Sequence, residues 1–186
     1  STEQHVRHSN ALHSVMRARG SYHVGPLARF NLNFEKLPEV AQQAALAVGL
    51  KPPVLNPFRS IGVRAVELIF ACHEALRLIA EYEQPPEPRV AAQVRAGTGM
   101  AATEAPRGTL YHRYTIDDRG LIHAARIVPP TAQNLKRMED DLWGYVPQLL
   151  HLPNDEIAWK AEQAVRNYDP CISCATHFLK LNHIRG

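Results

Sequence analysis

The chain has 186 residues, of which 45% are hydrophobic, and a formal net charge of +3 at pH 7, a composition that suits one globular domain with a buried core. Because its arginines are interleaved with glutamates and no apolar run reaches the roughly 18 residues of a membrane span, we expect neither nucleic-acid binding nor membrane insertion. Its 3 cysteines lack the spacing of a disulfide framework and no signal peptide opens the chain, so a cytoplasmic location is expected.

Gly20 and Gly25 mark the boundaries of the structure predicted for the N-terminal part of the chain. Residues 3–19 are predicted to form a helix that ends at Gly20. The following stretch is predicted to be irregular, because Gly25 and Pro26 interrupt any regular helix.

Two helices are predicted next, separated by a proline-rich loop. The first runs from about residue 38 to 48, with a proline in its first turn, and the loop "KPPVLNPF" follows it. The second helix is predicted from about residue 60 to 82, with an apolar face wide enough to need covering on more than one side. Its members are Ile61, Ala65, Val66, Leu68, Ile69, Phe70, Cys72, Leu76 and Ile79.

The C-terminal half is predicted to hold one β-hairpin and two helices. Residues 108–128 alternate as strands do around an Asp-Asp-Arg-Gly turn, which predicts the hairpin. A helix is expected from Thr131 to about Leu150, and another from Asn154 to just before Pro170. The expected fold is therefore mainly α (α+β), similar to a helical bundle with one small hairpin.

The sequence "DPCISCATH" contains Cys171, Cys174 and His177 at three-residue spacing. Haem attachment requires the histidine directly after the second cysteine, and a thioredoxin-like pair requires a preceding strand, so neither fits well. A structural zinc site needs four ligands, which Cys72 or His183 could complete, but neither lies in a second half-site. The pattern is best explained as half of a site for a soft transition metal. None of the other histidines forms a pair with metal-binding spacing.

This segment resembles the C-terminal cysteine motif of the large subunit of nickel–iron hydrogenases, DPCxxCxxH. Four further segments resemble the same family in the same order, so that the resemblance covers nearly the whole chain: "YHVGPLARFN", "NPFRSIGVRAVE", "EAPRGTLYHRYTID" and "IVPPTAQN". Within the family, the resemblance is greatest to cytoplasmic multisubunit enzymes that exchange electrons with NAD(P) or a similar carrier, including the sulfhydrogenase type.

The resemblance implies roles for the residues of these motifs. Cys171 would be a terminal ligand of nickel, and Cys174 would bridge nickel and iron in a Ni–Fe(CN)₂CO centre. Arg107 would lie over the open coordination position as a fixed cation, oriented by Asp169, where H₂ is split into a proton and a hydride. A cysteine thiolate on nickel or Arg107 would take up the proton. A pair of buried thiols and a surface arginine remain the alternative interpretations.

Three prolines and the C-terminal histidine complete the implied site. Pro106 would line the pocket beside Arg107, while Pro129 and Pro130 would form the wall around the cyanide and carbonyl ligands. His177 would bind Mg²⁺ or a similar cation together with the main-chain carbonyl near Arg126. The alternatives are termination of a strand for the prolines and an ordinary surface histidine for His177.

The resemblance also predicts how the chain fits into a larger protein. The family's second motif, RxCGxC, does not occur in the sequence, so we expect residues 1–177 to be the C-terminal part of the large subunit. Residues 178–186 are expected to be an extension that a maturation endopeptidase removes. The expected partners are H₂ and protons, an iron–sulfur small subunit and flavin/NAD(P)-binding subunits. The alternative function is that of a non-catalytic zinc-binding or interaction module.

Overall fold

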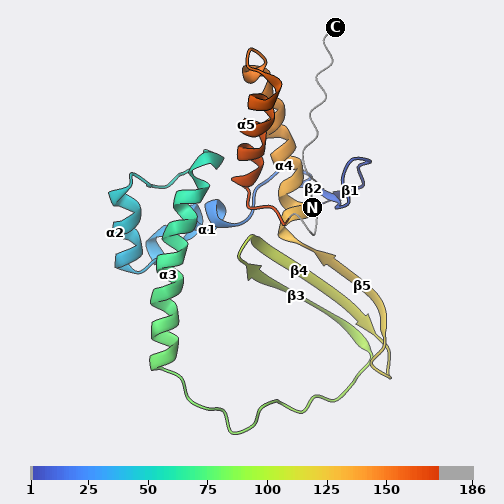
Figure 1. Cartoon of the computed structure of the whole chain (residues 1–186). Coiled ribbons are helices and arrows are strands. Elements are labelled where there is room, and N and C mark those ends of the chain that lie inside the picture. The colour runs from blue at the N-terminus through green and yellow to red at the C-terminus, as the bar shows by residue number, and fades with distance from the viewer. Residues whose placement is uncertain (1, 172–186) are drawn as a thin grey trace.

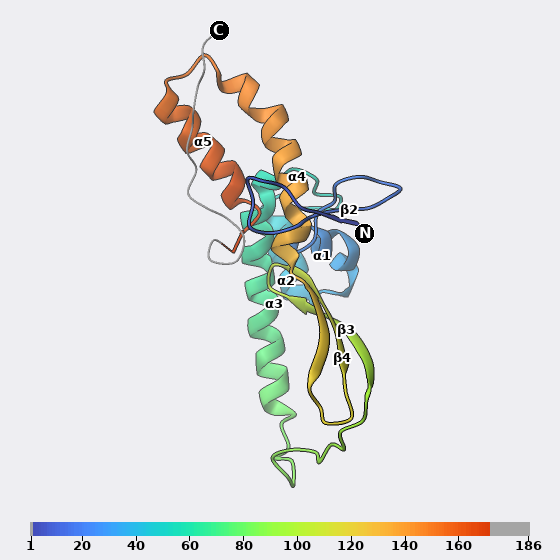
Figure 2. The ribbon, with the colours of Figure 1, turned by 90° about the vertical axis from the view of Figure 1, so that its right-hand side faces the viewer.

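The computed structural model describes residues 2–171, and three groups of elements meet near its centre (Figure 1). Helices α1, α2 and α3 form the first group, a three-stranded sheet the second, and the antiparallel helices α4 and α5 the third. The view turned by 90° shows that α3 and the sheet both extend away from α4 and α5 in the same direction (Figure 2).

The helical group contains the main hydrophobic core. Residues Pro26–Asn33 form helix α1, so the prediction of an irregular stretch is wrong there: Pro26 lies in the first turn, where a helix tolerates proline. Helix α2 (Glu39–Ala47) lies within the predicted range 38–48. The core cluster consists of Leu27, Phe30, Phe34, Ala41, Ala45, Leu50, Val54, Val63 and Val66. In the proline-rich loop, the side-chain amide of Asn31 makes hydrogen bonds of 2.8 and 2.9 Å with the main chain of Val54, which fastens the loop to α1.

Helix α3 (Ser60–Ala80) confirms the long predicted helix, but most of its apolar surface is not covered. Only Ser60, Val63 and Val66 are buried on it, against α1 and α2. The side chains of Ile61, Leu68, Leu76 and Ile79 are 66%, 68%, 69% and 72% exposed. The apolar residues of the predicted face therefore lie on α3, but nothing in the described part of the chain covers most of them.

The sheet contains the predicted hairpin and one additional strand. Strands β4 (Gly108–Ile116) and β5 (Ile122–Val128) form the hairpin expected at 108–128, and the carboxylate of Asp117 accepts two main-chain hydrogen bonds in its turn. Strand β3 (Gly97–Ala105) pairs with the other edge of β4 and was not predicted. Its sequence, "GTGMAATEA", is poor in the β-branched and aromatic residues that favour strands.

Helices α4 and α5 follow the sheet. Helix α4 (Pro130–Tyr145) continues into a short 3₁₀ helix (Val146–Leu149), close to the predicted range 131–150. Helix α5 (Asn154–Arg166) lies within the range predicted from Asn154 to Pro170 and buries Ile157 and Ala161. The overall mixture of helices and small sheets confirms the predicted mainly α (α+β) fold class.

The prediction of a helix at residues 3–19 is wrong. This segment contains two short antiparallel strands, β1 (Thr2–Gln4) and β2 (His13–Val15), joined by a loop. Strand β2 lies against α4, and there His13 and Ser14 are buried, although a surface helix would leave such polar residues in water. Packing against a distant helix therefore overrides the local preference. Among the described residues, no helix is long and apolar enough to span a membrane.

Candidate metal centre

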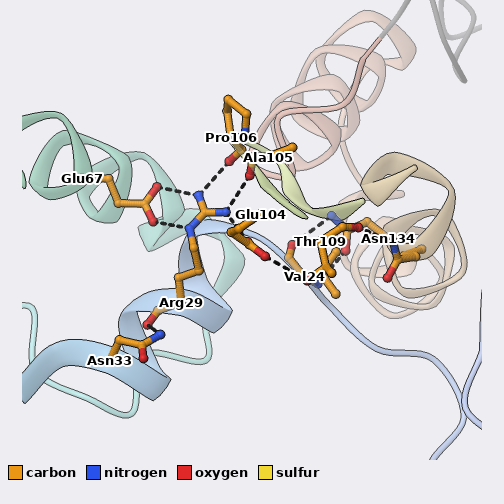
Figure 3. Close-up of polar contacts among 10 residues, drawn as sticks. Val24, Arg29, Asn33, Glu67, Glu104, Ala105, Pro106, Thr109 and Asn134 are labelled. Atoms are coloured by element: carbon orange, nitrogen blue, oxygen red, sulfur yellow. Dashed lines mark hydrogen bonds and ion pairs between the residues drawn. The ribbon is translucent and has the colours of Figure 1, made fainter. Parts of the chain in front are cut away.

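The turn between β3 and β4 carries Pro106 and Arg107, and Arg29 of α1 fixes the shape of this turn (Figure 3). The guanidinium of Arg29 donates to the carbonyl oxygens of Ala105 and Pro106 at 2.9 and 2.7 Å. It also forms a two-point ion pair with Glu67 of α3, at 2.7 and 2.8 Å, and a contact of 2.5 Å with Glu104. Arg29 therefore joins α1, α3 and the sheet at the base of the turn.

A close approach of two backbone segments places the turn against the start of α1. Gly25 has φ +109°, and a Cβ atom at this position would lie 2.6 Å from the carbonyl oxygen of Arg107. Gly108 has φ +131°, and a Cβ atom there would lie 2.6 Å from Cγ2 of Val24. Only glycine tolerates both the backbone angle and the lack of space. These two glycines thus allow the main chain of Arg107 to touch the segment before α1.

The beginning of α4 holds the same segment from the other side. The buried side chain of Asn134 accepts a hydrogen bond from the amide of Val24 at 2.8 Å and donates one to its carbonyl at 3.0 Å. The neighbouring Gln133 donates to the carbonyl of Thr109 in β4 at 2.6 Å, and accepts from the hydroxyl of Tyr22 at 3.2 Å. These polar residues bind main chain where no regular secondary structure would satisfy it.

Asp169 contacts Arg107, the residue with which the family resemblance pairs it. Nε of Arg107 donates a hydrogen bond of 2.6 Å to the main-chain carbonyl of Asp169 and lies 3.5 Å from its carboxylate. The other carboxylate oxygen lies 3.3 Å from the guanidinium of Arg64 on α3. Asp169 has φ +50°, in the left-handed region, so the backbone bends three residues after the end of α5.

Cys171 is positioned by the first turn of α4. Its amide donates a hydrogen bond of 3.3 Å to the hydroxyl of the buried Thr131. Pro129 and Pro130 immediately precede Thr131, and Pro130 is the first residue of α4. The structure thus brings Arg107 to Asp169 and Cys171 to the Pro129–Pro130 segment. Cys174 and His177 lie outside the described residues, so the predicted ligand set is placed only in part.

Several residues of this arrangement were not predicted. Arg29 and Arg64 each lie within a motif quoted for its family resemblance, but neither received a role. Their signal was the presence of an arginine among apolar residues, which usually means that a specific partner is nearby. The partners, Glu67 and Asp169, are far apart in the sequence, so the pairs could not be assigned before the fold was known.

A buried polar cluster supports the segment that leads to Cys171. The imidazole of His23 packs on the ring of Tyr168 at a centroid distance of 4.7 Å, and the hydroxyl of Tyr168 contacts Asp141 on α4. Burial lowers the pKa of His23 to about 4, against the opposing effect of Asp141, and Arg137 lowers it further. The same burial, together with Asp141, raises the pKa of Tyr168. Both groups are therefore uncharged at neutral pH.

The large cavity of the described residues does not contain the predicted site. A cleft of about 1230 Å³ lies between α1 and the sheet and includes Tyr22, Arg29, Glu104 and Arg113 in its lining. Arg107, Asp169 and Cys171 do not line it. The contacts of Arg107, Asp169 and Cys171 join the predicted site residues directly, whereas the cleft is wide and open to solvent.

Comparisons with known proteins agree on one family. A family model described as nickel-dependent hydrogenase matches residues 19–177. The alpha subunit of sulfhydrogenase 1 from Pyrococcus furiosus is 32% identical over 178 residues, which cover 95% of this chain and 41% of that protein. The beta subunit of the NAD-reducing hydrogenase HoxS from Cupriavidus necator is 33% identical over 183 residues, with coverage of 90% and 36%.

Comparison of the fold with solved structures identifies the same family. A crystal structure of an NAD⁺-reducing [NiFe]-hydrogenase in the H₂-reduced state superposes with a TM-score of 0.79 at 26% sequence identity. The match covers 95% of this chain and 41% of the other chain. The chain therefore spans less than half the length of the relatives that it matches.

Proposed function

Because this chain belongs to the nickel-dependent hydrogenase family, we propose that it is the C-terminal portion of a catalytic subunit that oxidises H₂ reversibly. The observation that carries the proposal is the contact of Arg107 with Asp169, which lies two residues before Cys171, together with the hydrogen bond from the amide of Cys171 to the start of α4. The family match and the fold support this function over the alternative of a non-catalytic zinc-binding or interaction module.

The donor atoms present suit the metal centre of the family. Thiolates are soft, strongly donating ligands, which nickel and low-spin iron accept, and Cys171 with Cys174 would supply two of them. When bound, the Ni–Fe(CN)₂CO centre supplies the electrophilic position at which H₂ is polarised. The chain contains no RxCGxC motif, so two more thiolates would come from another part of the complete subunit. His177 and the main-chain carbonyl near Arg126 are proposed to bind Mg²⁺ or a similar cation.

Arg107 would act as an oriented cation beside this centre. Its main chain is held by the turn that Arg29 ties to α1 and α3, and its Nε is bound by Asp169. The Asp169 carboxylate is itself shared with Arg64. A guanidinium fixed in this way needs no reorganisation when negative charge develops nearby, which is the condition for efficient electrostatic stabilisation. Pro106, Pro129 and Pro130 would restrict the space around the cyanide and carbonyl ligands.

The surface of the chain supports its place in a larger assembly. The exposed apolar side of α3, formed by Ile61, Leu68, Leu76 and Ile79, is larger than the scattered apolar residues of an ordinary surface. We propose that the remainder of the large subunit covers it. An iron–sulfur small subunit and flavin/NAD(P)-binding subunits are the proposed electron carriers, in a cytoplasmic complex, since two of the similar proteins are named as NAD-reducing.

Metal analysis and infrared spectroscopy of the complete enzyme would test the function. We expect one nickel per large subunit, iron in excess of nickel because the iron–sulfur clusters add to it, and the absorption bands of bound cyanide and carbon monoxide. The isolated 186-residue chain serves as the control and should reduce no dye with H₂, because two thiolates cannot retain the binuclear centre. Zinc alone in the complete enzyme, or substantial H₂-dependent dye reduction by the isolated chain, would contradict this proposal.

A further inference from the structure

A second group of metal-binding side chains lies away from the cysteines. His8 belongs to the loop between β1 and β2, His13 opens β2, and Glu139 lies on α4. One ligand atom of each residue lies within 4.8 Å of the other two. The rings of His8 and His13 meet edge to face at a centroid distance of 5.8 Å. Two imidazoles and a carboxylate from three separate segments therefore converge on one point.

His13 has an unsatisfied nitrogen at this point. Its side chain is only 2% exposed, and its Nδ1 makes no hydrogen bond within the described part of the chain. The nearest carboxylate oxygen, Oε2 of Glu139, is 3.5 Å away. A buried nitrogen without a partner carries an energetic cost that native structures normally avoid. A metal ion bound between Nδ1 of His13 and the carboxylate of Glu139 would give this nitrogen a partner and so remove the cost.

We propose that His8, His13 and Glu139 form a mononuclear site for a divalent transition-metal ion of the zinc type. Zinc is bound by two histidines and one glutamate in known protein sites, with a fourth position left for water. Imidazole nitrogen suits zinc and its first-row neighbours, whereas Mg²⁺ and Ca²⁺ require mainly oxygen ligands.

The geometry of the three residues allows the ion to enter. Nε2 of His8 lies 2.5 Å from Oε1 of Glu139, whereas tetrahedral zinc at about 2.0–2.1 Å from each ligand separates ligand atoms by roughly 3.3 Å. His8 must therefore move slightly outward. Its side chain is 67% exposed and can rotate, while His13 is held in place by burial. The buried histidine would define the position of the ion, and the exposed histidine would close over it.

This site is separate from the candidate nickel–iron centre and would have a different effect. Glu139 is nine residues beyond Pro130 on the same helix, which corresponds to about 13 Å along the axis. A metal at this position would fasten the β1–β2 segment to α4. The chain continues from this segment to Val24, which touches the turn of Arg107 through Gly25 and Gly108. The role of the ion would be structural.

Zinc titration of the chain carrying Cys72→Ser, Cys171→Ser and Cys174→Ser tests the proposal, since these substitutions remove all three thiolates that would compete for zinc. After treatment with a chelator, binding is followed by calorimetry and by the rise in Tm. We expect one equivalent of zinc, and a loss of affinity of at least about tenfold in both His8→Ala and Glu139→Gln. His5→Ala is the matched control, because His5 is an exposed histidine of the same loop.

The possible outcomes separate a metal site from a simple ion pair. If His8 and Glu139 only pair with each other, the parent chain will bind no zinc and its Tm will not respond, which would overturn the proposal. Equal zinc affinity in His8→Ala and His5→Ala would also overturn it. Because His8 is exposed, His8→Ala is expected to fold normally, and circular dichroism without zinc confirms that lost binding does not reflect unfolding.

Discussion

Arg107 and Asp169 are joined through the main chain as well as through their charges. Nε of Arg107 lies 2.6 Å from the carbonyl oxygen of Asp169 but 3.5 Å from its carboxylate, so the stronger contact depends on the backbone at Asp169. That backbone has the left-handed angle φ +50°. The bend after α5 therefore orients the arginine and directs the chain towards Cys171 at the same time.

Replacing Arg107 by lysine is predicted to lower turnover of the complete enzyme by about 100-fold, with little change in nickel and iron content. Lysine keeps the positive charge but loses the planar group whose Nε reaches the carbonyl of Asp169. Hydrogen-dependent dye reduction and metal analysis on the same preparations measure the two effects. Arg113→Lys, an exposed position on β4, is the control. Full metal content with unchanged turnover in Arg107→Lys would exclude a catalytic role for Arg107.

The Gly25→Ala substitution is predicted to destabilise the chain by more than about 2 kcal/mol. The new methyl group would lie 2.6 Å from the carbonyl oxygen of Arg107, at a residue with φ +109°. Gly99→Ala is the matched control, because no atom lies within 4 Å of a Cβ at that position, and its effect should stay within about 0.5 kcal/mol. Urea unfolding of the three proteins gives the comparison. Equal stability of both variants would show that Gly25 and Arg107 are not in close contact in solution.

Acid is predicted to destabilise the fold through His23. Its pKa is about 4 in the folded chain and 6.5 in the reference state, so the unfolded chain takes up a proton first as the pH falls. The contribution of His23 to stability is complete above about pH 6.5 and is lost between pH 6.5 and 4, by up to about 3 kcal/mol.

The variant His23→Phe keeps an aromatic ring against Tyr168 but cannot be protonated. Urea unfolding at pH 7 and at pH 4.5 should therefore show a smaller loss of stability in this variant than in the parent chain. His151→Asn, at an exposed position, should behave like the parent. Parallel pH profiles for the parent and His23→Phe would contradict the assignment of this pH dependence to His23.

Removal of residues 178–186 is predicted when the enzyme matures in its native host. The extension carries apolar residues beside basic ones, and its loss would leave a carboxylate on His177, which favours binding of a divalent cation. Intact-mass measurement of the nickel-loaded subunit, compared with a preparation made without nickel, tests this. We expect a C-terminus at His177 only in the nickel-loaded form. A mature subunit that still ends at Gly186 would show that no cleavage occurs after His177.

Local sequence determined most of the helices and the family. The proline and glycine that bound α2 and the apolar periodicity of α3 act within a few residues, so their signals are visible without a fold. Helix α1 is the exception, because Gly25 and Pro26 predicted an irregular stretch where this helix begins. The turn at Asp117 likewise gave the β4–β5 hairpin, because a carboxylate that binds nearby amides is a local device. The Arg107–Asp169 pairing came from the family resemblance, and their contact is present in the structure.

Tertiary structure alone decided the features that depend on distant partners. Strand β3 has a weak strand sequence and exists because its main chain pairs with β4, from Gly97–Ile116 to Ala105–Gly108. In the helix predicted at residues 3–19, His8 and His13 would point to different sides, because five residues correspond to about 140° beyond a full turn. In the fold, burial of β2 against α4 places both histidines beside Glu139. Such contacts join segments more than a hundred residues apart, and local spacing carries no information about them.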